Sequence, residues 1–487
     1  MLYIYHLTSL QYTIYKVVIF IMIGDNYMYK IDFNTPVHVH FIGIGGISMS
    51  GLADILFSKG FTISGSDMNE SALTKKLREK GMTINIGQCA QNITDDIDVV
   101  VYTAAIHSDN PEYEAVVAKN IPMLTRAELL GELMANYKVA IGVSGTHGKT
   151  TTTSMITDVM LAANLDPTVS VGGILPSING NLRIGSSDKF ITEACEYTNS
   201  FLSFSPTIEV ILNIEEDHMD FFKDIDDIRL SFKKYAGLLP SDGLLVINGD
   251  IDNAAYIYED LSCKVVTVGS SDKCDYYAAN LSYDENGCYS YTLMRNGTPV
   301  TEVKLGVTGI HNVYNSLATF AVADALDVPT QTTVDALLTF SGAHRRFQRK
   351  GTLNGFTVID DYAHHPTEIE STLKVASECK HNKVICIFQP HTYTRTNAFL
   401  KDFAKALSKV DQLILTDIYA AREVNTLGIS SLDLVKEIEQ YGTPCIYEPD
   451  FDKICDLVKN IASKDDLVIT MGAGNVVEIG EKILKDN

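Results

Sequence analysis

The sequence predicts an α/β protein that is built from three consecutive domains. The chain has 487 residues, which is too long for a single core, because domains typically have about 100–200 residues. Short apolar runs that are typical of buried strands also alternate with helical stretches from residue 37 onward. We place the domains at residues 28–138, 139–337 and 338–487, after a separate leader at 1–27.

The leader differs from the rest of the chain by its many Tyr, Ile and Val residues. Its densest apolar run, residues 17–23, allows a membrane anchor, but polar residues interrupt the segment and no small-residue cleavage site follows. An added edge strand is a second alternative. We favour a third interpretation, in which translation begins at Met22 or Met28 and the leader does not belong to the protein.

The composition is that of a soluble globular enzyme, with 46% apolar and 21% charged residues. Lys and Arg number 39 and Asp and Glu number 61, and the resulting net charge of −22 argues against nucleic-acid binding and stable membrane association. The 9 cysteines are odd in number and include no Cys-x-x-Cys pair. We therefore expect a cytoplasmic protein with reduced thiols and without a zinc cluster.

The first domain begins with a strand at residues 37–42, a glycine turn and a helix at 52–59, which is a Rossmann-like layout. A second strand at 61–64 leads to Asp67, about 20 residues past the turn, where an acid can bind a ribose or similar diol. Because Ser48 replaces the third glycine of the dinucleotide pattern, a nucleotide diphosphate fits as well as a nicotinamide cofactor. A turn without a ligand remains the alternative. The candidate binding residues are Gly43, Gly45, Gly46, Ile47, Ser66 and Asp67.

The second domain opens with a strand, a glycine-rich loop and a helix, the order that a phosphate-binding loop requires. Lys149 can reach the β- and γ-phosphates of a nucleotide, and the Thr150 hydroxyl can bind the accompanying Mg²⁺. Val143 occupies the first glycine position of the strict pattern, so an ordinary turn remains the alternative. The sequence thus predicts a central sheet like that of phosphate-loop ATPases. The loop residues assigned to the nucleotide are Gly145, Thr146, His147, Gly148, Lys149, Thr150 and Thr151.

Acidic residues and a histidine follow two further strands of this domain. Glu193 follows the strand at 190–192, and His218 lies in the polar cluster after the strand at 209–213. Because parallel strands end at the same edge of a sheet, these groups can complete a metal site beside the phosphates. Helix capping and surface charge are the alternative for Asp217 and His218.

Two asparagines precede an alanine-rich helix later in this domain. Asn312 and Asn315 lie on one face of a helix by their spacing and could bind an adenine edge. From the residues alone, helix capping is the favoured explanation.

The third domain repeats the strand and helix alternation and is also Rossmann-like. Its expected strands lie at 358–359, 384–388, 412–415 and 467–470, and polar residues crowd their ends. We expect these ends to face a substrate.

Seven segments carry a resemblance to the bacterial Mur ligases of peptidoglycan synthesis, which covers the chain from about Met28 to the C-terminus. They are residues 43–47, 145–151, 217–220, 311–315, 345–347, 360–367 and 389–391. One departure is the sequence Glu-Ala-Cys-Glu-Tyr at 193–197, where many relatives have Glu-Ala-Asp-Glu-Ser. Another is Thr392, where some relatives carry an additional arginine. These departures concern the surroundings of the metal and the selection of the amino acid.

The resemblance implies a carbon–nitrogen ligase that uses ATP and Mg²⁺ to join L-alanine to the lactyl carboxylate of UDP-N-acetylmuramate. ATP would phosphorylate the carboxylate, and the amine would attack the acyl phosphate. The first domain would bind the UDP-sugar, the central domain ATP, and the third domain would close over both. This reaction belongs to peptidoglycan precursor synthesis.

The resemblance also implies roles for single residues. Lys149 would stabilise the transferring phosphoryl group, Thr150 and Glu193 would hold one Mg²⁺, and His218 would hold a second. Asn312, Asn315 and Arg345 would contact ATP, and His365 and Arg395 would face the muramyl and alanyl groups.

Three other functions remain as alternatives. A ligase that attaches a preformed tripeptide to the same sugar shares the phosphate loop, but the glycine turn and residues 361–366 favour addition of alanine. A nicotinamide dehydrogenase would leave the phosphate loop and the third domain without a role. A non-catalytic nucleotide or UDP-sugar sensor is disfavoured by Lys149, Glu193 and His218.

Overall fold

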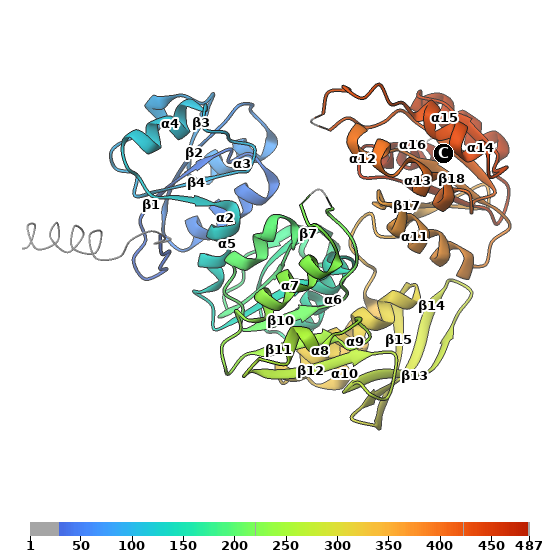
Figure 1. Cartoon of the computed structure of the whole chain (residues 1–487), viewed down its shortest axis with the longest axis horizontal. Coiled ribbons are helices and arrows are strands. Elements are labelled where there is room, and N and C mark those ends of the chain that lie inside the picture. The colour runs from blue at the N-terminus through green and yellow to red at the C-terminus, as the bar shows by residue number, and fades with distance from the viewer. Residues whose placement is uncertain (1–28, 220, 422, 486–487) are drawn as a thin grey trace, which may run out of the picture. The chain divides into compact units, whose positions relative to one another are not determined.

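The computed structural model describes residues 29–485 except 220 and 422, so the expected leader at 1–27 lies outside the described residues. The described residues form three sheets flanked by helices (Figure 1), which is the α/β architecture that the sequence predicts. They divide into two compact units, with the boundary between Tyr137 and Lys138, and Ser203–Ser205 belong to the first unit. In this part of the chain, no helix is both long enough and apolar enough to cross a membrane.

The first unit contains a parallel five-stranded sheet in the order β3-β2-β1-β4-β5. Chain order reverses at β1, and ligands of such sheets bind beyond the strand ends at this point. The strands are β1 (His38–Ile42), β2 (Thr62–Asp67), β3 (Thr83–Ile86), β4 (Val99–Tyr102) and β5 (Met123–Thr125). The helices are α2 (Ile47–Ser58), α3 (Ala72–Glu79), η1 (Ala90–Asn92), α4 (Pro111–Ala118) and α5 (Arg126–Met134).

The second unit contains a ten-stranded sheet in the order β15-β14-β13-β12-β11-β10-β6-β9-β7-β8. Its central strands are parallel, so β6, β9 and β10 end at one edge, as expected for the phosphate loop and the acids. The strands are β6 (Val139–Ser144), β7 (Thr168–Leu175), β8 (Gly180–Arg183), β9 (Lys189–Glu193), β10 (Ile208–Ile211), β11 (Leu244–Asn248), β12 (Lys264–Gly269), β13 (Tyr276–Tyr283), β14 (Cys288–Arg295) and β15 (Thr298–Thr308). The antiparallel meander β13–β15 was not anticipated from the sequence.

Helices cover both faces of this sheet. They are α6 (Lys149–Ala162), η2 (Pro176–Ile178), η3 (Tyr197–Ser203), α7 (Ile225–Ala236), α8 (Ala255–Tyr258), α9 (Ile310–Ala325) and α10 (Thr330–Thr339). On one face, Ile156 and Leu317 of α6 and α9 join Val143 of β6 in the main core. On the other, Tyr235 of α7 stacks on Phe201 with ring centroids 4.4 Å apart. This packing fixes the strand ends that carry the site.

The same unit contains a six-stranded sheet in the order β16-β17-β21-β18-β19-β20. Only β16 is antiparallel to its neighbour, so the ends of β17, β18 and β19 again share one edge. The strands are β16 (Gln348–Leu353), β17 (Phe356–Asp361), β18 (Val384–Phe388), β19 (Gln412–Leu415), β20 (Cys445–Tyr447) and β21 (Leu467–Met471). The helices are α11 (Pro366–Glu378), α12 (Tyr393–Ala398), α13 (Leu400–Leu407), α14 (Ser431–Glu439), α15 (Phe451–Ile461) and α16 (Val477–Lys485).

Two functional helices begin earlier than the sequence indicated. Helix α2 begins at Ile47 rather than Leu52, and α6 begins at Lys149, earlier than the helical pattern that starts at Ser154 in the sequence. In both cases a glycine, Gly46 or Gly148, occupies the N-cap position without a side-chain cap. Both helices therefore start directly at their glycine turns. Since no side chain caps them, the N–H groups of the first helical turn can bind an anionic ligand.

Candidate active site

A cleft of about 1700 Å³ lies within the second unit. Its lining includes the phosphate loop at 146–151, Glu193, and residues of α9 and of the third domain. Most of the residues that the sequence assigned to the nucleotide and to the second substrate therefore share one space.

The phosphate loop connects β6 to α6 in a conformation that requires glycine. Gly145 and Gly148 have φ angles of 133° and 87°, in the region that L-residues avoid. A Cβ atom on Gly148 would also lie 2.9 Å from Oδ1 of Asn315. Asn315 of α9 therefore lies directly against the loop at Gly148 and leaves no room for a side chain there.

Asn213, which follows β10, holds the loop in this shape. Its Oδ1 accepts a hydrogen bond from the His147 N–H at 2.7 Å, and its Nδ2 donates to the His147 carbonyl oxygen at 3.0 Å. The Asn213 carbonyl oxygen accepts from the Thr146 N–H at 3.2 Å. These three bonds fix the loop relative to the neighbouring strand.

Lys149 is paired with Glu196, a residue that the sequence did not assign to the site. Its Nζ lies 2.9 and 3.1 Å from the two Glu196 carboxylate oxygens and donates to the Gly145 and Thr146 carbonyl oxygens. Burial lowers the pKa of Lys149, but the negative charge of Glu196 more than offsets this effect and the pKa is raised. Lys149 therefore stays cationic in the cleft.

Thr150 and Glu193 both border a pair of glycines in β7. Oε1 of Glu193 accepts a hydrogen bond from the Gly172 N–H at 2.6 Å. A Cβ on Gly173 would lie 3.2 Å from Cγ2 of Thr150. The side chains of the two residues that the sequence paired as metal ligands thus lie beside adjacent residues of one strand.

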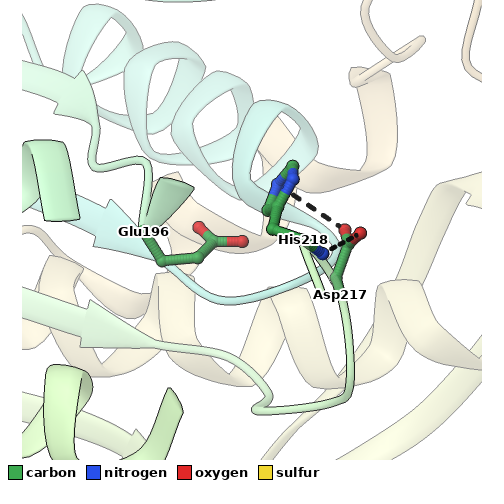
Figure 2. Close-up of side chains that lie close together, drawn as sticks. All are labelled: Glu196, Asp217 and His218. Carbon is green, nitrogen blue, oxygen red and sulfur yellow. Dashed lines mark hydrogen bonds and ion pairs between the residues drawn. The ribbon is translucent and has the colours of Figure 1, made fainter. Parts of the chain in front are cut away.

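Glu196, Asp217 and His218 converge near the loop (Figure 2). One potential ligand atom of each lies within 4.8 Å of the others. Figure 2 shows the Glu196 carboxylate directed toward the His218 imidazole, while Asp217 comes from the same loop as His218. The helix-capping alternative for Asp217 and His218 was wrong, because Asp224 is the N-cap of the next helix, α7.

An aromatic ring covers the His218 imidazole. The rings of Tyr197 and His218 are stacked with centroids 4.4 Å apart and an interplanar angle of 28°. Tyr197 precedes two residues in left-handed conformation, Thr198 and Asn199. This irregular segment brings both Glu196 and Tyr197 toward the loop that carries His218.

Asn312 and Asn315 are buried on one face of α9, as their spacing predicts. Nδ2 of Asn315 donates to Oδ1 of Asn312 at 2.9 Å, and Nδ2 of Asn312 donates to the Thr308 carbonyl oxygen at 2.7 Å. The favoured capping explanation was wrong, because Gly309 is the N-cap of α9 and no side chain caps the helix.

The third domain contributes His365 and Arg395 to the cleft. Burial lowers the pKa of His365, and the Asp217 carboxylate opposes this effect. The Arg395 guanidinium lies 3.2 Å from Nδ1 of His391. The third domain thus contributes a neutral imidazole and a cation to the cleft.

Arg345 and Arg346 have different environments. Arg345 donates to Asp360 and to the carbonyl oxygens of Gly472 and Gly474, all in the third domain. Arg346 lines the cleft instead. The sequence assigned Arg345 to ATP, whereas Arg346 is the one of the two that lines the cleft.

The glycine turn of the first unit lies between β1 and α2. The N–H groups of Gly43 and Ile44 donate to the Ser66 carbonyl oxygen, both at 2.9 Å. The N–H of Gly45 donates to Oδ2 of Asp67 at 2.9 Å. Ser66 is fully buried, so it supports the turn from behind, whereas Asp67 is partly exposed.

Models of known protein families match the chain over most of its length. Residues 38–138 match "Mur ligase family, catalytic domain", residues 143–323 match "Mur ligase middle domain", and residues 345–474 match "Mur ligase, glutamate ligase domain". The chain belongs to the Mur ligase family.

Curated relatives of this Mur ligase match it from end to end of their own chains. The UDP-N-acetylmuramate–L-alanine ligase of Lachnospira eligens is 57% identical over 94% of this chain and 100% of the relative. The enzyme of the same name from Agathobacter rectalis is also 57% identical, with the same coverage. The crystal structure of the UDP-N-acetylmuramate–alanine ligase of Thermotoga maritima has a TM-score of 0.75 and 29% identity, and covers 92% of this chain and 98% of that chain.

Glu196 and Asn213 of this Mur ligase were not among the site residues predicted from the sequence. Glu196 lies only three residues after Glu193, so a second acid in the segment after β9 was a usable signal. Asn213 could not be distinguished from any polar residue that ends a strand. Its importance follows from the hydrogen bonds to His147, which lies 66 residues away in the chain.

Proposed function

We propose that this Mur ligase joins L-alanine to the lactyl carboxylate of UDP-N-acetylmuramate in an ATP-dependent reaction. Relatives that are 57% identical over their full lengths support this substrate pair. The observation that carries the proposal is the cleft that Lys149 and His218 share with His365 and Arg395. A phosphoryl-transfer centre and groups suited to a second substrate are thus found in one space.

The chemistry explains why a phosphate loop is needed. A carboxylate is a poor electrophile, so an oxygen of the lactyl carboxylate attacks the γ-phosphorus of ATP, and ADP leaves. The alanine amine then attacks the carbonyl carbon of the acyl phosphate, phosphate leaves, the amine nitrogen loses a proton and the amide bond remains. Lys149 and the loop N–H groups stabilise the negative charge of the transferring phosphoryl group.

The donor groups fit Mg²⁺, which prefers oxygen ligands and shares them with substrate phosphates. We assign one ion to Thr150 and Glu193, and a second to His218 with Glu196 and Asp217. A bound Mg²⁺ offsets negative charge on phosphate oxygens during transfer. The ion pair with Lys149 supports a role of Glu196 in charge balance, and its place beside Asp217 and His218 supports the assignment to a metal.

The remaining roles follow the same arrangement. ATP is assigned to the loop residues 145–151 and to Asn312 and Asn315, with Arg345 ordering the segment that presents Arg346. The UDP-sugar is assigned to Gly43, Gly45, Gly46, Ile47 and Asp67, with Ser66 behind them. His365 and Arg395 are assigned to the muramyl and alanyl groups. Domain boundaries remain those proposed from the sequence, near residues 138 and 337.

We place this reaction in the cytoplasm, where ATP is available and thiols stay reduced. The 9 cysteines without a paired spacing support this location. The net charge of −22 supports the absence of nucleic-acid and membrane partners.

The test is phosphate release from ATP and Mg²⁺ in the presence of UDP-N-acetylmuramate, with and without L-alanine, together with the mass of the product. Alanine-dependent release and a product heavier by one alanyl residue are expected. Release with a tripeptide but not with alanine would support the recycling ligase instead. Binding of both nucleotides without any release would support the sensor.

A further inference from the structure

A fully buried carboxylate lies behind the glycine turn of the first unit. Glu112, the second residue of α4, has no exposed surface. Its Oε2 accepts a hydrogen bond from the Ser66 hydroxyl, and its Oε1 accepts one from the Asn92 amide, both at 2.5 Å. A buried charge is costly unless it is paired and hydrogen-bonded, so its presence here requires an explanation.

A histidine of β1 provides a partner for this carboxylate. Nε2 of His40 lies 4.0 Å from Oε2 of Glu112, and both side chains are fully buried. Burial raises the pKa of Glu112, but the interactions with His40, Ser66 and Asn92 outweigh it, so the pKa is lower than usual. Glu112 is therefore ionised at neutral pH. Its negative charge strengthens the hydrogen bonds that it accepts.

The first donor, Ser66, directly precedes Asp67 at the end of β2. While its hydroxyl is held by Glu112, its carbonyl oxygen accepts the hydrogen bonds from Gly43 and Ile44 that shape the glycine turn. A shift of Ser66 would therefore move the turn and Asp67 together.

The second donor, Asn92, acts on the other side of Asp67. Besides Glu112, Asn92 donates to the Gly87 carbonyl oxygen at 3.0 Å, and the Gly87 N–H donates to the Asp67 carbonyl oxygen at 2.8 Å. The Asp67 side chain in turn binds the Gly45 N–H. Glu112 thus connects, through two separate routes, to the backbone on both sides of Asp67.

We propose that Glu112 is a positioning residue that sets the affinity for UDP-N-acetylmuramate by holding Asp67 and the glycine turn in place. The inference rests on the proposed function, because the UDP-sugar is the ligand assigned to this turn. Glu112 is too deeply buried to touch the sugar, so it acts through Asp67. A purely structural role would instead change stability without a selective change in substrate affinity.

The experiment compares Glu112→Gln with the wild-type enzyme. Glutamine keeps the shape of the side chain, but its amide group cannot accept one of the two hydrogen bonds. We expect the KM for UDP-N-acetylmuramate to rise about tenfold, while kcat and the KM for ATP change less than about twofold. Calorimetric binding of UDP-N-acetylmuramate without ATP should weaken by the same factor.

Glu132→Gln is the matched control, because Glu132 is also a buried glutamate of the first unit, with 2% exposure. It accepts from the Ile31 N–H at 3.0 Å and pairs with Lys30 rather than with the turn. This variant should lose thermal stability to a similar extent but keep its KM for UDP-N-acetylmuramate. Ser66→Ala, which removes one of the two routes, should raise that KM by about threefold.

Equal KM values in Glu112→Gln and Glu132→Gln would overturn the inference, and an unchanged KM in Ser66→Ala would exclude the route through Ser66. If Glu112→Gln does not fold, Ser66→Ala and the control decide the question. If the wild-type enzyme binds UDP-N-acetylmuramate but releases no phosphate, the proposed function fails while the binding assay still tests Glu112. If the wild-type enzyme does not bind this sugar, both proposals fail.

Discussion

Lys149 of the phosphate loop forms an ion pair with Glu196 of the segment after β9, with Nζ 2.9 Å from the nearer carboxylate oxygen. The side chains have exposures of only 16% and 3%, so the pair is largely shielded from water. The positive charge of Lys149 is thus balanced within the protein by a buried carboxylate.

Lys149→Met should abolish turnover. Methionine fills similar space but removes the charge that stabilises the transferring phosphoryl group, and we expect a loss of about 10³-fold in kcat. Binding of UDP-N-acetylmuramate should stay within about twofold, since its assigned turn lies in the other unit. Phosphate release and calorimetry measure the two effects. Turnover near the wild-type rate would contradict the role of Lys149.

Glu196→Gln should destabilise the enzyme by about 3 kcal/mol, because it leaves the largely buried Lys149 cation without its charged partner. The double variant Glu196→Gln with Lys149→Met should recover much of this stability but no activity. Denaturant unfolding measures the free energy of unfolding of the wild type, both single variants and the double variant. These four values give the coupling free energy between the two side chains. If the two changes in unfolding free energy simply add, the ion pair does not contribute to stability.

His218→Ala should lose most of the activity and require more Mg²⁺ for the remainder, because one proposed metal ligand is removed. Titration of phosphate release with Mg²⁺ tests this expectation. Asp224→Ala, which removes the N-cap of α7, is the control for structural loss in the same region. Full activity of His218→Ala at the ordinary Mg²⁺ concentration would exclude a role in metal binding.

Tyr197→Ala should lower kcat about fivefold, because the stacked ring restricts the orientation of His218 and such pairs contribute about 0.5–1.5 kcal/mol. Tyr197→Phe keeps the ring and should stay within about twofold of the wild type. The test compares the kcat values of the two variants, measured at saturating substrate concentrations. Equal losses in both would assign the effect to the hydroxyl group instead of the stack.

Glu209→Leu should stabilise the protein increasingly as pH rises. Glu209 is buried on β10, and neither carboxylate oxygen has a hydrogen-bond partner among the described residues. Burial raises its pKa well above the usual value, so the folded state binds a proton that the unfolded state releases above about pH 4.5. The wild type therefore loses stability as pH rises through the folded pKa of Glu209.

Thermal unfolding at pH 5 and pH 8 measures this effect. The gain in midpoint temperature for Glu209→Leu over the wild type should be larger at pH 8. The hydroxyl of Tyr235, which lies beside Gly142, the residue paired with Glu209 in the sheet, should remain in place. A gain that is equal at both pH values would mean that Glu209 does not change its protonation in this range.

Several site residues were predictable because local chemistry defines them. A strand, two glycines and a lysine at fixed spacing form a phosphate loop in many proteins, and Lys149 was found in this way. Asp67 was found by its distance from the glycine turn. Glu196 was not, because it meets Lys149 from 47 residues away along the chain, and no spacing rule encodes that contact.

The sequence by itself determined the α/β class, the two glycine turns and the family to which the chain belongs, because periodicity and motif spacing act over a few neighbouring residues. Tertiary structure alone decided which distant groups meet. It paired Lys149 with Glu196, placed Asn315 against Gly148 and buried Glu112 behind Ser66. Such contacts join residues that are far apart in the chain. They depend on sheet order and on the close packing of whole helices and strands, which no local sequence pattern records.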